Sequence, residues 1–255
     1  MGQLRPGNTH PGSGAGPFLQ RCLEALGELA RSRLIVRADA AWCSEAVFAR
    51  LEAEGASYII VARATAAVKR KLVAKAHWRT LEGGIQVGSF HLALDGWSRT
   101  RRLCAVRTPV AEGASPQGKL FDESGYTYQL LVTDLAHPAE RVWRLYNGRA
   151  NAENVIKELK GGFNLDKPPT GSWRANEAYL QLCLVAYNLY VGYLRELYAP
   201  GGRVHWTVQT MRLVHFHVAG RWVKRARRWI IKINRSFAFK RDFMLCERRL
   251  LRLRI

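Results

Sequence analysis

Residues 34–39 read Leu-Ile-Val-Arg-Ala-Asp, a short apolar run that ends in an acid. A second run, Tyr-Ile-Ile-Val, follows at residues 58–61. Short continuous apolar segments of this kind are typical of strands that are buried on both faces. Apolar spacing over residues 17–31 predicts a helix before the first run, and Ser44 is a plausible N-cap for a helix that reaches about Gly55. The alternation of helix and strand favours a parallel α/β sheet.

The pattern changes after this first unit. Strands are predicted at residues 85–90, 102–106 and 126–132, and Gly, Pro and Ser turns separate them. A long apolar helix is predicted from Ala175 to Tyr198. We therefore divide the chain into a loop (1–16), an α/β core (17–77), a β-rich insertion (78–137), a helical part (138–200) and a basic C-terminal segment (201–255).

Composition narrows the class of partner. The chain has 255 residues, 48% of them hydrophobic, and a formal net charge of +20. Such an excess of Lys and Arg indicates that the partner is a polyanion, most simply nucleic acid. Neither a spanning helix nor a signal peptide is predicted, which argues against a membrane partner. The five cysteines are scattered without CxxC spacing, as expected in a reducing cytoplasm.

Asp39 stands at the carboxyl end of the first predicted strand. In open α/β sheets, ligand sites gather at this end of the strands. Asp39 is therefore a candidate site acid. The alternative is that its carboxylate simply begins a turn or caps the next helix.

A second set of polar residues lies far downstream. Residues 146–160 read Tyr-Asn-Gly-Arg-Ala-Asn-Ala-Glu-Asn-Val-Ile-Lys-Glu-Leu-Lys. If they form one helix, Tyr146, Arg149, Glu153 and Lys160 share an arc of roughly 60°. A carboxylate beside two cations suits a metal ion working on a phosphate backbone. The same spacing also fits a salt-bridged surface helix, and the turn signal at Asn147 and Gly148 could start the helix later, which would leave Tyr146 on a loop.

This spacing resembles the Tyr-Arg-Glu-Lys signature of bacterial insertion-sequence transposases of the DDE type. Residues 157–163, 174–176 and 184–189 extend the resemblance, which covers roughly residues 4–234. Members of this family are similar in fold to ribonuclease H and retroviral integrases. The resemblance thus implies a partial ribonuclease H-like α/β sheet with a β-rich insertion and a helical C-terminal part. Its partner would be DNA, both the mobile-element ends and the target.

The resemblance also assigns roles to single residues. Asp39 and Glu153 would be the second and third of three acids that hold two Mg²⁺ or Mn²⁺ ions for phosphoryl transfer. Arg149 and Lys160 would hold DNA phosphates, and Tyr146 would contact DNA nearby. The family usually continues from its second acid with Ser-Gly-Phe or similar. Here Ala-Ala-Trp follows Asp39, so the turn behind the acid is altered.

No candidate for the first acid precedes Asp39. Only Glu24 and Glu28 occur there, both within the predicted first helix. We therefore expect a C-terminal portion of a transposase without its first catalytic Asp, truncated or inactive by itself. It would depend on self-association or on an upstream transposase fragment, near the nucleoid in a bacterial cytoplasm. The alternative is a non-enzymatic basic nucleic-acid-binding protein.

The C-terminal segment supports both interpretations. Residues 203–255 carry 15 Lys or Arg and two acids, with tryptophans interleaved. This pattern predicts phosphate contacts and base stacking, with Arg225, Arg227 and Arg228 as DNA-binding residues. The alternative is a partly buried terminal strand and helix whose aromatic side chains belong to a core.

Overall fold

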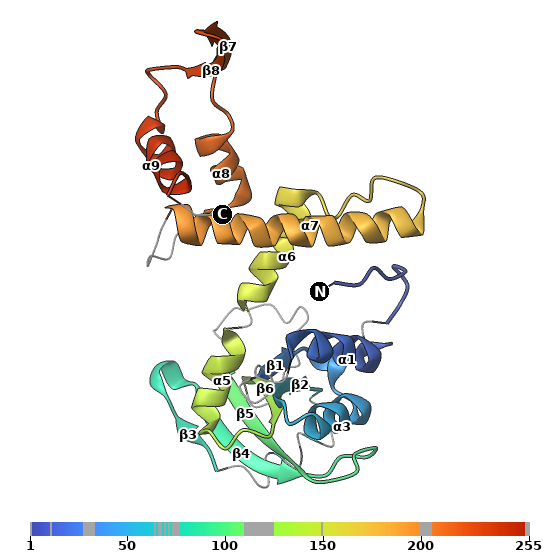
Figure 1. Ribbon diagram of the computed structural model, residues 1–255. Helices are drawn as coiled ribbons and strands as arrows, with labels where there is room; N and C mark the ends of the chain where they lie inside the picture. The colour runs from blue at the N-terminus through green and yellow to red at the C-terminus, as the bar shows by residue number, and fades with distance from the viewer. Residues whose placement is uncertain are drawn as a thin grey trace. The chain divides into compact units, whose positions relative to one another are not determined.

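The computed structural model describes residues 2–10, 12–27, 34–63, 65, 68, 70, 72, 77–109, 125–148, 150–198 and 206–252. The chain forms two compact units (Figure 1). Residues 5–151 make the sheet unit, and residues 1–4 with 152–255 make the helical unit.

Within the described residues, the sheet unit holds a six-stranded sheet in the order β1-β2-β6-β5-β4-β3. The strands are β1 (Ile35–Ala38), β2 (Ser57–Ala62), β3 (Arg79–Thr80), β4 (Gln86–Leu92), β5 (Arg101–Pro109) and β6 (Tyr126–Thr133). The β1–β2 pair is parallel, as predicted, with Ile35 opposite Ser57. All other pairs are antiparallel.

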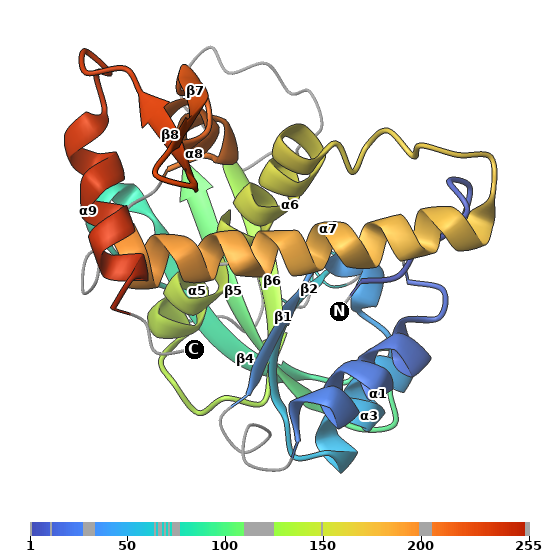
Figure 2. The same cartoon turned by 45° about the horizontal axis from the view of Figure 1, so that its top comes forward.

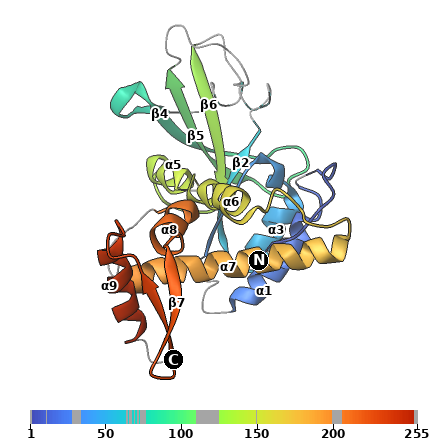
Figure 3. The same ribbon diagram turned by 90° about the horizontal axis from the view of Figure 1, so that it is seen from above.

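The strands predicted as an insertion continue the same sheet. β6 pairs with β2, with Ile59 opposite Thr133, and β5 and β4 follow on its far side (Figure 3). The β-rich stretch and the first α/β stretch therefore share one core. Among the described strands, β1 pairs only with β2, so it forms one edge of the sheet.

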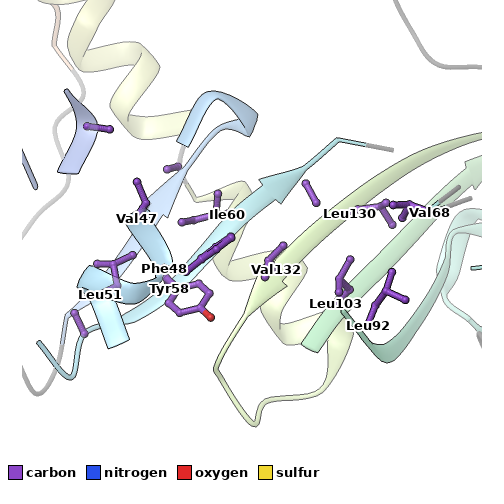
Figure 4. Packing of buried hydrophobic residues seen from close by; sticks show 14 of the residues in the cluster. Val47, Phe48, Leu51, Tyr58, Ile60, Val68, Leu92, Leu103, Leu130 and Val132 are labelled. Carbon is purple, nitrogen blue, oxygen red and sulfur yellow. The ribbon is translucent and has the colours of Figure 1, made fainter. Parts of the chain in front are cut away.

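Two helices cover one face of the sheet. They are α1 (Ala15–Leu26) and α3 (Glu45–Ala53). Phe48 and Leu51 of α3 pack with Tyr58 and Ile60 of β2, and side chains of β5 and β6 complete the cluster (Figure 4). The short 3₁₀ helix η1 (Ala40–Trp42) connects β1 to α3.

A third helix, α5 (Ala139–Asn147), covers the opposite face. Val142 and Tyr146 pack against Ile59, Cys104 and Leu131. These strand residues alternate with those of the first cluster, because successive side chains of a strand point to opposite faces. Burial on both faces explains why β2 reads as a continuous apolar run.

One arginine fastens α3 to the sheet. The Arg101 side chain, 2% exposed, donates hydrogen bonds to the carboxylates of Glu45 and Glu52. Its guanidinium also lies over the rings of Phe48 and Trp97. The buried charge is therefore neutralised by two acids and packed between aromatic rings, an arrangement that is costly to break at one partner.

The sheet unit also contains the short 3₁₀ helix η2 (Glu82–Gly84), and the helical unit contains the elements from α6 onward. They are α6 (Ala150–Phe163), α7 (Trp173–Tyr193), the π-helical turn η3 (Leu194–Tyr198), α8 (Val208–His215), β7 (Gly220–Arg225), β8 (Arg228–Ile233) and α9 (Lys240–Leu250). α7 and η3 match the predicted long helix. None of the described helices combines the length and the hydropathy that a membrane-spanning segment requires.

Contacts in the C-terminal half of α6 hold this unit together. The Glu158 carboxylate accepts a hydrogen bond of 2.9 Å from the Val208 backbone N–H, at the start of α8. The Tyr179 hydroxyl donates to the Phe163 carbonyl at 2.9 Å. A Cβ at Gly162 would lie 2.9 Å from Val208 Cβ, so α6 approaches α8 closely only because residue 162 is a glycine.

Candidate active site

Asp39 is exposed directly after β1, at the carboxyl end of this strand, and the parallel strand β2 ends at the same end of the sheet. It is the N-cap of η1, and the Ala41 backbone N–H donates a hydrogen bond of 3.0 Å to Asp39 Oδ1. The capping role that the sequence left open is therefore present. It fixes the orientation of the carboxylate in an exposed position.

The opening segment of the sheet unit lies against this turn. The Gly12 backbone comes so close to the Ala41 carbonyl that a Cβ at residue 12 would lie 2.3 Å from its oxygen. Gly12 also donates its N–H to His10 Nδ1. His10, Gly12 and Ser13 therefore form one wall beside the turn that carries Asp39.

Two cavities open on either side of Ala40. One, of about 640 Å³, is lined by His10, Cys43, Arg63 and Asp95 among others. Burial raises the pKa of the Cys43 thiol there to about 11, so this cysteine stays protonated at neutral pH. The other cavity, of about 810 Å³, is lined by Arg63, Trp143 and Asn147 among others.

Arg63 lines both cavities and was not predicted as a site residue. It follows β2 directly and is exposed. Because β1 and β2 are parallel, Arg63 and Asp39 follow the carboxyl ends of their strands at the same end of the sheet. Its position after a buried strand is the signal that sequence reasoning could have used. The exposed guanidinium can bind a phosphate at this end of the sheet.

The prediction of one helix from Tyr146 to Lys160 is wrong. α5 ends at Asn147 and α6 begins at Ala150, so Tyr146 and Glu153 belong to different helices. The turn signal at Asn147 and Gly148 does mark the break, but Tyr146 lies on a helix rather than on a loop. Arg149 lies outside the described residues.

Tyr146 also differs from expectation in its surroundings. It is 8% exposed and packs with Ile59, Cys104, Leu131 and Val142. Spacing alone could not distinguish an outward-facing phenol from a buried one. The Tyr146 ring anchors the last turn of α5 on the sheet, and its contact with DNA stays a prediction.

An arginine of β1 holds the break between the two helices. Arg37 Nη1 donates a hydrogen bond of 2.7 Å to the Leu145 carbonyl, in the last turn of α5. A Cβ at Gly148 would lie 2.7 Å from the same nitrogen. Arg37, two residues before Asp39, thus ties the strand that carries this acid to the junction that leads into α6.

Glu153 and Lys160 both lie exposed on α6. On the same helix Leu159 is buried, whereas Ile156 is 50% exposed. Asp39 belongs to the sheet unit and Glu153 to the helical unit. Their approach to one another therefore stays a prediction.

The donor atoms fit a divalent metal in kind but not yet in number. Exposed carboxylates such as those of Asp39 and Glu153 are the ligands that Mg²⁺ and Mn²⁺ prefer. The described part of the chain contains no group of three or more His, Cys, Asp or Glu side chains that could hold a metal.

The predicted DNA-binding arginines of the C-terminal segment are exposed. Arg225 ends β7, Arg228 begins β8, and Arg227 lies in the turn between them. Trp222 and Trp229 on the same hairpin are 66% and 65% exposed. These two tryptophans therefore do not belong to a core, against the alternative left open by the sequence.

Comparison with known families decides the assignment. A family model described as transposase DDE domain group 1 matches residues 1–255, the whole chain. The chain belongs to this transposase family. No curated protein matches it. Its function is accordingly DNA transposition, and DNA is its partner.

Membership of this family implies chemistry that depends on divalent metal ions. Members of DDE transposase families generally use divalent metal ions held by acidic side chains. The chain presents an exposed acid after β1, an exposed acid and a lysine on α6, and a strongly cationic hairpin, and the roles of these residues stay predictions.

Proposed function

We propose that Asp39 and Glu153 hold the divalent ions, Mg²⁺ or Mn²⁺, with which this transposase acts on the ends of a mobile DNA element. The observation that carries the proposal is the exposed, oriented carboxylate of Asp39 at the carboxyl edge of a parallel strand pair. Family membership supplies the chemistry, and Glu153 is the exposed acid of the signature that the sequence resembles.

The bound ions would activate a water or a DNA 3′-hydroxyl and stabilise the leaving oxygen of the cleaved strand. The residues of the chain bind and orient. Asp39 is preset by its hydrogen bond from Ala41, and Arg37 fixes the end of α5 from which the chain leads to Glu153. Arg63, Lys160 and Arg149 are the cations that would position the DNA phosphates.

The fold is consistent with a ribonuclease H-like interpretation, in which β1 and β2 are the parallel strands of the catalytic sheet. β1 has a neighbour on one side only among the described strands. In this reading its open edge receives a strand that carries a further acid. We propose that this acid comes from another transposase chain or fragment, and that the present chain by itself cleaves no DNA.

The first experiment is a nicking assay on DNA that carries the element ends, with Mg²⁺ or Mn²⁺. The wild-type chain alone is expected to leave the DNA intact, because two acids do not anchor two ions. Robust cleavage that Glu153→Gln abolishes would contradict the proposal that Asp39 and Glu153 need a further acid. Asp95→Asn would then test whether Asp95, which lines the cavity beside the Asp39 turn, completes the site.

Metal binding tests the two acids without requiring activity. Electron paramagnetic resonance of Mn²⁺, in the presence of DNA, should detect weak binding to the wild-type chain. Asp39→Asn and Glu153→Gln should each weaken it, whereas Glu82→Gln, a change at an exposed acid elsewhere in the sheet unit, should not. Equal Mn²⁺ binding by all four proteins would refute the assignment of these acids.

A second candidate function is non-catalytic DNA binding. The cationic hairpin and the net charge of +20 support it. In that case Asp39→Asn and Glu153→Gln would change neither metal binding nor any activity reconstituted with a partner fragment. Both candidates place the protein with DNA, in the nucleoid of a bacterial cell.

A further inference from the structure

The hairpin formed by β7 and β8 has two chemically different faces. Opposite residues in an antiparallel pair lie on the same face. One face therefore carries the pairs Arg221 with Lys232, Val223 with Ile230, and Arg225 with Arg228. The other face carries Trp222 with Ile231, and Lys224 with Trp229.

The charges on the cationic face destabilise the hairpin itself. Two like-charged pairs stand directly opposite one another, which destabilises an isolated sheet. Residues 220–233 contain six Lys or Arg and no acid. A two-stranded hairpin is marginally stable by itself, so an external polyanion would relieve a repulsion that the described hairpin leaves uncompensated.

The aromatic face is equally unusual for a surface. Trp222 and Trp229 meet edge to face with ring centroids 6.4 Å apart, and both are about two-thirds exposed. Lys224 Nζ lies 5.8 Å from the Trp229 ring centroid. Two accessible indole rings beside an ammonium group match the arrangement that stacks bases and contacts the backbone of a single strand.

The turn presents a further cation at the tip. Ala226 and Arg227 both have positive φ, 44° and 61°, as the two-residue turns favoured in twisted hairpins require. The hairpin projects beyond α8 and α9 within the helical unit (Figure 1), and Figure 2 shows it from a second side. Most residues of both strands are exposed, so both faces of the hairpin are open to a ligand.

We propose that this hairpin binds DNA at a junction between duplex and unpaired bases. The face with Arg221, Arg225, Arg228 and Lys232 contacts duplex phosphates, and the face with Trp222 and Trp229 stacks on the unpaired bases. The two ends of the cationic face are about 13 Å apart along a strand, close to the major-groove width of about 12 Å. The hairpin is thus of a size to reach phosphates on both sides of the groove.

Charge selects DNA over a second copy of the protein as the occupant. The chain carries a net charge of +20, so two copies that met through a surface with six cations and no acid would repel one another. The proposal relies on the transposase assignment only for the choice of DNA as the polyanion. It does not depend on Asp39, Glu153 or metal.

The test measures binding of the full chain to a labelled duplex and to the same duplex with an unpaired tail, by fluorescence anisotropy with a metal chelator present. Wild type should bind the tailed DNA about tenfold more tightly, because each stacked base adds affinity. The double variant Trp222→Ala, Trp229→Ala should lose this preference while binding the plain duplex within about twofold of wild type. Trp222→Phe with Trp229→Phe should retain much of the preference, whereas the matching leucine substitutions should not, since leucine has no ring to stack.

A triple variant tests the cationic face. The variant that combines Arg221→Ala, Arg225→Ala and Arg228→Ala should weaken binding to both DNAs. The slope of the logarithm of the binding constant against the logarithm of salt concentration should become shallower by about three, because about three fewer counterions are released. Trp173→Ala is the matched control for the tryptophans, since Trp173 is 49% exposed at the start of α7. Lys240→Ala with Arg241→Ala is the control for the cations, on α9 of the same unit. Hydrogen exchange of α8 and α9 should match wild type in every variant, which shows that the unit remains folded.

Three outcomes would overturn the proposal. The first is an unchanged preference for tailed DNA in the Trp222→Ala, Trp229→Ala variant. The second is equal binding of both DNAs by wild type. The third is a wild-type oligomer in sedimentation that this variant dissociates, which would make the aromatic face a contact between copies. Because metal is chelated throughout, none of these outcomes depends on Asp39 and Glu153.

Discussion

At the scale of single residues, Arg101 is the side chain whose loss should cost the sheet unit most. It is enclosed by Glu45, Glu52, Phe48 and Trp97. Arg101→Met leaves two acids facing an apolar side chain, and we expect it to lower the free energy of unfolding of this unit by about 3 kcal/mol. Hydrogen exchange of β2 and β5 amides reports this unit separately from the helical unit.

Arg99 provides the control for that measurement. It also pairs with Glu52, at 2.7 Å, but its side chain is 58% exposed. Arg99→Met should therefore lower the free energy of unfolding much less than Arg101→Met does. Equal effects of the two substitutions would show that the buried position of Arg101 adds nothing.

The same cluster predicts a dependence of stability on pH. Burial would by itself raise the pKa of Glu52, but hydrogen bonds from Arg101, Arg99 and Tyr58 outweigh it and hold that pKa at about 2. Since the unfolded value is about 4.3, this stabilisation is present above about pH 4.3 and is lost as pH falls towards about 2. Denaturation at a series of pH values should show a shallower loss for Glu52→Gln than for wild type below about pH 5. Parallel curves would contradict the assignment.

At the scale of elements, the junction between α5 and α6 depends on a contact between strand and helix. Arg37→Met removes the hydrogen bond to the Leu145 carbonyl. Gly148→Ala places a methyl group where Arg37 Nη1 now lies. Each change should destabilise the end of α5 by about 1 kcal/mol, seen as faster hydrogen exchange of its last turn.

A double-mutant cycle makes this prediction sharper. Once Arg37 is replaced, the space beside residue 148 is open, so adding Gly148→Ala should cost nothing more or even stabilise the helix end. Strictly additive effects would mean that Arg37 and Gly148 act independently and that the strand does not hold the junction.

The elements that the sequence predicted well are those with local signals. The apolar runs at 34–36 and 58–61 lie on β1 and β2, and the three later strands also overlap their predictions. Their pairing into one sheet was not predictable locally, because the partners in β2 and β6 are far apart in sequence; the Thr133–Tyr58 hydrogen bond, for example, spans 75 residues. The break at Gly148 likewise involves Arg37, whose bond to Leu145 spans 108 residues. For the candidate site, strand-end position found Asp39 but passed over Arg63, and spacing could not reveal that Tyr146 is buried.

At the scale of the whole molecule, the edge of β1 predicts association, because among the described strands β1 pairs only with β2. Unpaired strand edges pair with other chains unless they are protected. Sedimentation should show concentration-dependent association of the isolated chain, with slower hydrogen exchange at residues 35–38 as concentration rises. Association without any change at these residues would place the contact on another surface.

The central claim is that Asp39 and Glu153 meet at shared metal ions, although they belong to different compact units. Paired ions in such sites are about 4 Å apart, so radicals generated at either ion reach both segments. The most direct measurement replaces Mg²⁺ by Fe²⁺ in the complex with DNA, adds ascorbate and peroxide, and maps where the protein backbone is cut. Cuts near residues 39 and 153, both reduced by Glu153→Gln, are the predicted result. Cuts near one of them only, or cuts near residue 39 that survive Glu153→Gln, would contradict a shared site.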